Sequence, residues 1–305
     1  MDRKLWALVY SLVMEIDHPN SSTTWIGYSD RVILLVEFWA HAHNMSILWA
    51  TSRENWRWPD LMPATLPHQT TMSRRLRTIS VAALRDRLYA HWREVCPGER
   101  GWLREVDGKP LVVNGFSKDP EARWGYASKT LAKGYKMHSI WDAGLVPAAW
   151  EVCPMNAGES KVAVGLVQSL PEGVGGYLLG DSAFDSNSLH AVTSAKNLQL
   201  VAPPKKKNRQ LGHRPHEPSR LRSLHLIQTT FGEALYEQRS KIERNLSHLV
   251  TNRVGLDRLP WHVRRLHRVQ RFVQNKLILE ACYRWLQLDS GSILPHSDAP
   301  ITQAA

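Results

Sequence analysis

Residues 177–185 read Tyr-Leu-Leu-Gly-Asp-Ser-Ala-Phe-Asp, an apolar run that stops at Asp181. A short apolar run next to glycine is typical of a buried β-strand, and a charged residue directly after it marks the end of the strand. Downstream, residues 187–196 have helical spacing and residues 198–202 form another apolar run. The alternation of strand, helix and strand is typical of an α/β fold.

Three further strands are expected upstream of this unit. Alternating and β-branched residues predict strands at residues 102–113, 134–141 and 146–152. Residues 159–170 have the spacing of an amphipathic helix. Three hairpin-like strands followed by helix, strand, helix and strand is the element order of a ribonuclease H-like domain. The sequence therefore predicts an α/β fold with a mixed five-stranded sheet flanked by helices.

The segments on either side of this unit differ in character. The first hundred residues read as all-α, with Asp30 placed to cap a helix that runs to Asn44. After the last strand, a basic loop to about residue 222 precedes helices expected at residues 231–251 and 261–288. The predicted division is a helical domain at 1–100, a ribonuclease H-like domain at 101–288 and a disordered tail at 289–305 that is rich in Ser, Pro and Ala.

Positive charge is concentrated in one part of the chain. The 305 residues carry a net charge of +11, and residues 203–276 alone hold 17 basic and 5 acidic side chains. A basic segment inside a folded region favours a polyanionic partner, so we expect it to contact nucleic acid through residues such as Lys205, Lys206 and Lys207.

The remaining composition excludes several classes of protein. No apolar run approaches the ~20 residues that span a bilayer, and the N-terminus lacks the apolar core of a signal peptide. The 3 cysteines are far apart, so neither a disulfide framework nor a zinc knuckle is expected. We therefore expect a cytoplasmic protein without a membrane partner.

A short polar-basic helix is predicted at residues 68–77, after a connection interrupted by prolines. Its side chains are of the types that contact phosphates and base edges in a major groove, as in a helix-turn-helix. The candidates are Gln69, Ser73, Arg74 and Arg77. A plain structural helix with the same residues is the alternative.

Three carboxylates stand out by their positions. Asp107 lies within the first predicted strand, Asp181 ends the fourth, and Glu243 lies in a late helix. Strands one and four are neighbours in a ribonuclease H-like sheet, so the two aspartates should converge, and Mg²⁺ prefers such oxygen ligands. In isolation an aspartate after a strand is more often a cap or turn former, as we expect of Asp185, and a helical glutamate is more often a surface ion pair.

These residues resemble the bacterial insertion-sequence DDE transposases that carry a Tyr-x2-Arg-x3-Glu signature. The matching segments are Val106–Gly108, Lys133–His138, Gly144–Pro147, Pro154–Ser160 and Gly180–Ser186, with Tyr236, Arg239 and Glu243 at the signature spacing. The resemblance covers about residues 100 to 285, and Leu66–Leu76 is similar to helix-turn-helix segments that precede such domains.

The resemblance implies a cut-and-paste recombinase. Such an enzyme binds the terminal inverted repeats of its element as a homodimer, hydrolyses the DNA ends and joins the freed 3′-hydroxyls to target DNA. Asp107, Asp181 and Glu243 would hold two Mg²⁺ ions, which Mn²⁺ can replace, and Tyr236 and Arg239 would contact DNA near the cleaved end. The setting implied is the bacterial nucleoid.

Two departures from the family pattern qualify this assignment. Val250 stands where the family often has a lysine, and we expect Arg253 to supply the missing cation. Glu243 follows Asp181 by 62 positions, which leaves no room for a large β insertion that handles a hairpin intermediate. A non-catalytic DNA-binding derivative or repressor of the same element is the alternative function, and a structure-specific nuclease of the same fold is a third.

Overall fold

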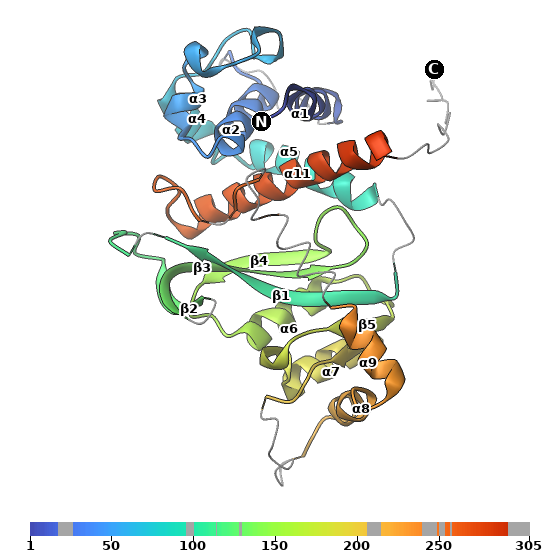
Figure 1. Cartoon of the computed structure of the whole chain (residues 1–305). Coiled ribbons are helices and arrows are strands. Elements are labelled where there is room, and N and C mark those ends of the chain that lie inside the picture. Colours follow the sequence, from blue (N-terminus) through green and yellow to red (C-terminus); the bar gives the residue numbers. More distant parts are fainter. Residues whose placement is uncertain are drawn as a thin grey trace.

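A computed structural model describes residues 1–17, 27–95, 101–113, 115–127, 130–205, 215–239, 249, 254–256 and 258–291. Within these ranges the chain forms a mixed, curled β-sheet with helices on both faces (Figure 1). The strands are β1 (Leu103–Val112), β2 (Arg123–Ala127), β3 (Thr130–Trp141), β4 (Ala149–Pro154), β5 (Gly176–Leu179) and β6 (Leu198–Val201).

The order of the strands is the feature that positions the site. The sheet runs β2-β3-β1-β5-β6, and β4 also pairs with β3. β1 is antiparallel to β3 but parallel to β5, and β5 is parallel to β6. Without β2, the order β4-β3-β1-β5-β6 is consistent with the predicted ribonuclease H-like sheet.

The strand β2 was not predicted. Its five residues pair with the N-terminal half of β3, whereas β4 pairs with the C-terminal half. Four of the β2 residues lie at least partly exposed, so the strand lacks the apolar alternation that identifies a strand in sequence. The sheet therefore has six strands rather than five.

Two layers of helices cover the sheet because alternate residues of each strand face opposite sides. Helices α6 (Glu159–Ser169) and α7 (Asn187–Ala195) cover one face, where Val106, Ile140 and Leu178 are buried. The long helix α11 (Leu266–Gly291) lies against the other face, packed on β4. Most of the N-terminal helices lie beyond α11, and the last of them, at residues 79–94, lies beside α11 and contacts the connection between β3 and β4 (Figure 1).

The described N-terminal residues are helical, as expected. The helices are α1 (Arg3–Glu15), α2 (Asp30–Ala42), α3 (Ile47–Ala50), α4 (Gln69–Arg75) and α5 (Ile79–Glu94), with single 3-10 turns η1 (Arg53–Asn55) and η2 (Pro59–Leu61) before α4. Ser29, not Asp30, caps α2, because Asp30 is buried and its carboxylate pairs with Arg75 at 2.5 Å. The predicted cap was therefore wrong.

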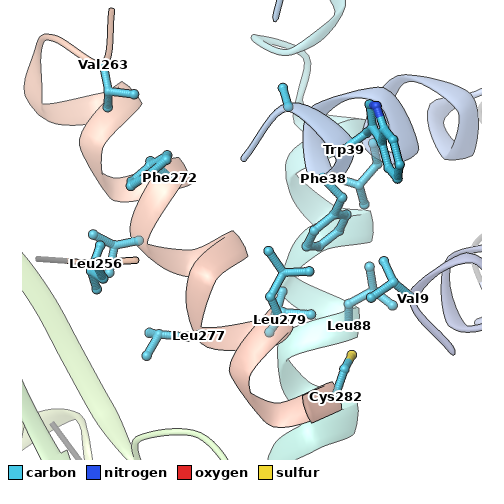
Figure 2. Close-up of a cluster of buried hydrophobic side chains, with 14 of the residues drawn as sticks. Val9, Phe38, Trp39, Leu88, Leu256, Val263, Phe272, Leu277, Leu279 and Cys282 are labelled. Atoms are coloured by element: carbon cyan, nitrogen blue, oxygen red, sulfur yellow. The ribbon is translucent and has the colours of Figure 1, made fainter. Parts of the chain in front are cut away.

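One continuous cluster of buried side chains joins these helices to the rest of the chain. Figure 2 shows Val9, Phe38 and Leu88 of the N-terminal helices packed near Leu279 and Cys282 of α11. The same cluster extends to β1, β3 and β4 on the sheet. A separate helical domain with a boundary at residue 100 therefore stays a prediction.

Two short helices follow the sheet where sequence predicted a loop and one longer helix. Residues Pro218–Leu226 form α8, which was expected to be part of the basic loop, and Thr230–Glu237 form α9. The rest of the helix predicted to residue 251 lies mostly outside the described residues. In the described part of the chain, no helix is both long and apolar enough to cross a membrane.

Candidate active site

Two aspartates meet where β1 and β5 run side by side. The parallel register pairs Leu103 with Tyr177 and Glu105 with Leu179. Asp107 and Asp181 each lie two residues beyond the last paired residue of β1 and β5, and they are close enough for the charge of Asp181 to act on Asp107. The residues that precede the two aspartates are also close: a Cβ on Gly180 would lie 3.1 Å from Cγ1 of the Val106 side chain. The predicted convergence of Asp107 and Asp181 thus follows from the pairing of two strands.

Backbone amides hold both carboxylates in place. Oδ1 of Asp107 accepts a hydrogen bond from the N–H of Gly108 at 2.7 Å. Oδ1 of Asp181 accepts from the N–H of Ala183 at 2.7 Å and so caps the 3-10 turn η3 (Ser182–Phe184). A hydrogen bond to one carboxylate oxygen limits the orientations of the side chain, as in a preorganised site.

The helix α9 brings a tyrosine and an arginine to the same edge of the sheet. Leu235 packs on Leu179 of β5, which places the neighbouring Tyr236 over the strand end. The Tyr236 hydroxyl donates to the carbonyl of Gly180 at 3.4 Å, and Nη1 of Arg239 donates to the Tyr236 hydroxyl at 3.3 Å. The side chains of the signature tyrosine and arginine are therefore linked to the Asp181 turn.

The charges of the four side chains interact. Burial raises the pKa of Asp107, and the negative charge of Asp181 raises it further, whereas the Gly108 amide and Arg239 act to lower it. Burial acts to lower the pKa of Arg239, but its hydrogen bond to Tyr236 and the two aspartates outweigh that effect, so the pKa is raised. Two carboxylates held together in this way attract a cation.

A second group of polar residues lies beneath Gly108, on the face of the sheet that α6 covers. Lys136 of β3 pairs with Glu159, in the first turn of α6, at 2.6 Å. His138 is fully buried beside them, and neither ring nitrogen has a hydrogen-bond partner among the described residues. Glu159 falls within a segment that matched the family pattern, but a glutamate in a first helical turn carries no signal of a nearby site by itself.

Asp185 connects the acidic turn, the turn η3 with Asp181 and Asp185 at its two ends, to the basic segment at residues 203–276. Its carboxylate pairs with Arg220 of α8 at 2.6 Å and accepts from the backbone N–H of Lys205 at 3.3 Å. Asp185 was expected to be a cap or turn former: it ends the turn η3, whereas the hydroxyl of Ser186 caps α7. Arg220 is 35 residues away, so sequence spacing alone could not identify this ion pair.

The other predicted site residues divide into three groups. Glu243, Lys206, Lys207 and Arg253 lie outside the described residues, as does Val250. Lys205 is exposed beside the acidic turn. Gln69, Ser73, Arg74 and Arg77 are exposed on or next to α4, in the helical layer beyond α11 (Figure 1). The third carboxylate of the predicted site therefore stays a prediction.

The carboxylates of Asp107 and Asp181 are ligands of the kind that a divalent cation prefers. Two carboxylates with their orientation held by backbone amides offer the hard oxygen ligands that Mg²⁺ takes, and Mg²⁺ fills its remaining positions with water and phosphate oxygen. Over the described ranges, no group of three or more His, Cys, Asp or Glu side chains is arranged to hold a metal ion. A complete ligand set would need a residue such as Glu243.

Comparison with known proteins gives one match. The protein family described as transposase DDE domain matches residues 99–279, which is more than half of the chain. The match begins just before β1 and ends within α11, so it contains both aspartates, Tyr236 and Arg239. No curated protein and no solved structure matches the chain.

Proposed function

This chain belongs to the transposase DDE domain family, and we propose that it is an active DDE transposase. It cleaves DNA strands at the ends of its own element with Mg²⁺ and joins the freed 3′-hydroxyls to target DNA. Its partners are the terminal inverted repeats and the target duplex, which it binds as a homodimer in the bacterial nucleoid.

The observation that carries the proposal is the pairing of β1 with β5, because it brings Asp107 and Asp181 to one edge of the sheet. Burial and the nearby Asp181 both raise the pKa of Asp107, so the charged pair is unfavourable for the folded chain by itself. A non-catalytic DNA-binding derivative has no use for such a pair. Its retention therefore supports catalysis over the repressor alternative.

Each site residue has a separate task in this proposal. Asp107 and Asp181 hold the divalent ions, with Glu243 as the third ligand. Two such ions, when bound, activate the attacking oxygen and stabilise the leaving oxygen of a phosphoryl transfer. Tyr236 holds the Gly180 carbonyl beside Asp181, and Arg239 offers its guanidinium to a phosphate of the cleaved end.

The surrounding cations position the DNA. The backbone N–H of Lys205 donates to Asp185, next to the acidic turn. Lys205 therefore lies where the DNA end must approach. Lys206 and Lys207 continue this contact, and Arg253 replaces the family lysine at the position of Val250. Gln69, Ser73, Arg74 and Arg77 bind the inverted repeat away from the cleaved bond.

The test uses a labelled duplex that carries the element end. Asp107→Asn and Asp181→Asn should each lower Mg²⁺-dependent cleavage by at least ~10³-fold, a barrier change of about 4 kcal/mol, while DNA affinity changes less than about threefold. Asp86→Asn is the matched control, because Asp86 lies on α5 and accepts from Gln274 at the surface.

Three outcomes decide between the functions. Either aspartate variant cleaving at the wild-type rate contradicts the active-site assignment. Wild-type protein that binds the element end but never cleaves it, with Mg²⁺ or Mn²⁺, favours the repressor alternative. Cleavage of any branched DNA without preference for the element end favours a structure-specific nuclease.

A further inference from the structure

A hollow of about 480 Å³ lies between α4 and the segment that enters α11. Residues far apart in sequence line it from two sides. Gln69, Ser73 and Arg77 come from the α4 side, and Arg264, Arg268 and Arg271 from the α11 side. The sequence presented these as two separate basic features, whereas the fold makes them opposite walls of one site.

The hollow carries a net positive charge. Glu37 is the one acidic side chain among the described residues that line it, and Arg85 balances that charge at 2.5 Å. His41 also lines the hollow, but burial lowers its pKa to about 3, so it is neutral near pH 7. The charges of four arginines therefore remain, including the exposed side chains of Arg77 and Arg268.

Hydrogen bonds fix the two walls relative to each other. Nη1 of Arg271 donates to the carbonyl of Leu76 at the end of α4 at 2.6 Å, and its Nε lies 3.6 Å from Oε1 of Glu37. Arg75 ties α4 to the start of α2 through Asp30. The helices that carry the arginines are thus held together at the hollow.

A second hollow of about 670 Å³ adjoins the first and extends toward β1. The two share Trp261, Val263 and Arg264, and the second reaches Val112 and Val113 at the end of β1. The backbone N–H of Arg265 and that of Leu266 donate to Asp119 and Glu121, which lie between β1 and β2, so this segment is held against the sheet.

The second hollow lies at the far end of the strand that carries Asp107. From Asp107 to Val112 the chain advances five residues, or about 17 Å at ~3.3 Å per residue. That length corresponds to about 5 base pairs of B-form DNA at ~3.4 Å each. A duplex that reaches the acidic edge could therefore contact the hollows several base pairs away.

We infer that the two hollows form one phosphate-binding track for duplex DNA, in which Arg77 and Arg268 grip the same stretch of sugar-phosphate backbone from opposite sides. Ser73 and Gln69 add uncharged donors to the phosphate oxygens, and the exposed Trp261 marks the joint between the hollows. This binding needs no metal. The spacing of the track from the cleaved bond rests on the proposed function, but the phosphate grip does not.

The first test measures binding without cleavage, so every variant also carries Asp107→Asn. Fluorescence anisotropy measures the affinity for a random duplex between 50 and 200 mM salt. Arg77→Ala and Arg268→Ala should each flatten the log–log salt dependence by ~0.9, and the double variant by ~1.8. Arg57→Ala, on an exposed arginine that does not line the hollow, should leave it unchanged. An unchanged dependence in the double variant overturns the inference.

Phosphate-ethylation interference then locates the track on the element end. Ethylation of some phosphates should weaken binding by the wild-type protein but not by the Arg77→Ala, Arg268→Ala double variant. These phosphates should lie about 5 or more nucleotides from the cleaved bond. Phosphates at the cleaved bond itself would overturn the placement. If the wild-type protein never cleaves, the proposed function fails, yet the salt dependence still decides whether the hollows bind phosphate.

Discussion

The acidic edge and the basic hollow are built in opposite ways. Asp107 and Asp181 lie just beyond the paired residues of β1 and β5, and each carboxylate accepts a hydrogen bond from a backbone amide one or two residues later. The hollow instead depends on a buried ion network in which Glu37, from α2, contacts Arg85 from α5 and faces Arg271 from α11.

Because of this difference, a substitution should affect the two regions in different ways: the site at the acidic edge, and the stability of the fold under the hollow. Replacing a carboxylate at the acidic edge by its amide should remove the charge and leave the fold, because the side-chain oxygen that accepts from the Gly108 or Ala183 amide is kept. Replacing a member of the network under the hollow leaves a charge buried without its partner, so the fold itself is weakened. Four predictions test this contrast.

Glu37→Gln should have the largest effect on stability. Arg85 is 2% exposed, and loss of its partner should lower the free energy of unfolding by about 3–5 kcal/mol. Asp107→Asn should leave stability unchanged or slightly higher at pH 7, because burial and Asp181 raise the pKa of Asp107 and make its charged form unfavourable. Urea unfolding of both variants at pH 7 measures the contrast, and equal losses would contradict it.

Acid should weaken the same network. Burial lowers the pKa of His41 to about 3 in the folded chain, against 6.5 unfolded, so between these pH values the unfolded chain binds the extra proton. The free energy of unfolding should therefore fall by up to ~1.4 kcal/mol per pH unit as the pH drops below 6.5.

Glu37 adds to this loss at lower pH. Burial acts to raise its pKa, but Arg85, His41 and Arg271 lower it to about 2, so stability is lost as the pH falls below the ordinary value of 4.5. Melting curves from pH 7 to pH 4 measure both effects. His41→Gln should flatten the dependence above pH 4.5, whereas His225→Gln, on an exposed residue of α8, should not.

Tyr236→Phe should have a smaller effect, and on the acidic edge only. It removes the donor to the Gly180 carbonyl and the acceptor for Arg239, each a bond that contributes about 1 kcal/mol. Cleavage should fall by about tenfold with little change in melting temperature. Tyr177→Phe, a half-buried tyrosine on β5, serves as the matched control. A wild-type cleavage rate in Tyr236→Phe would separate the tyrosine from the reaction.

Arg74→Ala should have the smallest effect. Arg74 is exposed on α4 but does not line the hollow, so its loss should remove at most one phosphate contact, a change of ~0.9 in the salt dependence. We expect it to weaken binding to the element end more than binding to a random duplex. Equal losses on both duplexes would argue against base recognition by α4.

Much of the fold followed from local patterns. The strand that contains Asp107, the strand that precedes Asp181, and helices α6, α7 and α11 were predicted within a few residues because each has an apolar repeat of its own. β2 and α8 were missed because one is mostly exposed and the other lies in a run of charge. The match to the transposase DDE domain confirms the family that the motifs indicated.

The ion pairs of Glu37 and Asp185 were not predicted, for a different reason. Glu37 is visible in the sequence as a charge inside an apolar run, which signals a buried partner. Nothing local identifies that partner as Arg85, 48 residues away, or pairs Asp185 with Arg220, 35 residues away. Such contacts depend on how helices pack, and packing has no short-range signature.

The sequence by itself indicated the five strands other than β2, the proximity of Asp107 and Asp181 and the basic character of the chain. These follow from hydrophobic periodicity, from the topology of parallel strands and from summed charge, which are local or additive properties. Only the tertiary structure placed Arg77 across a hollow from Arg268, and beside a buried Glu37. That placement depends on side-chain packing between α2, α4 and α11, where contacts between residues distant in the chain decide the geometry.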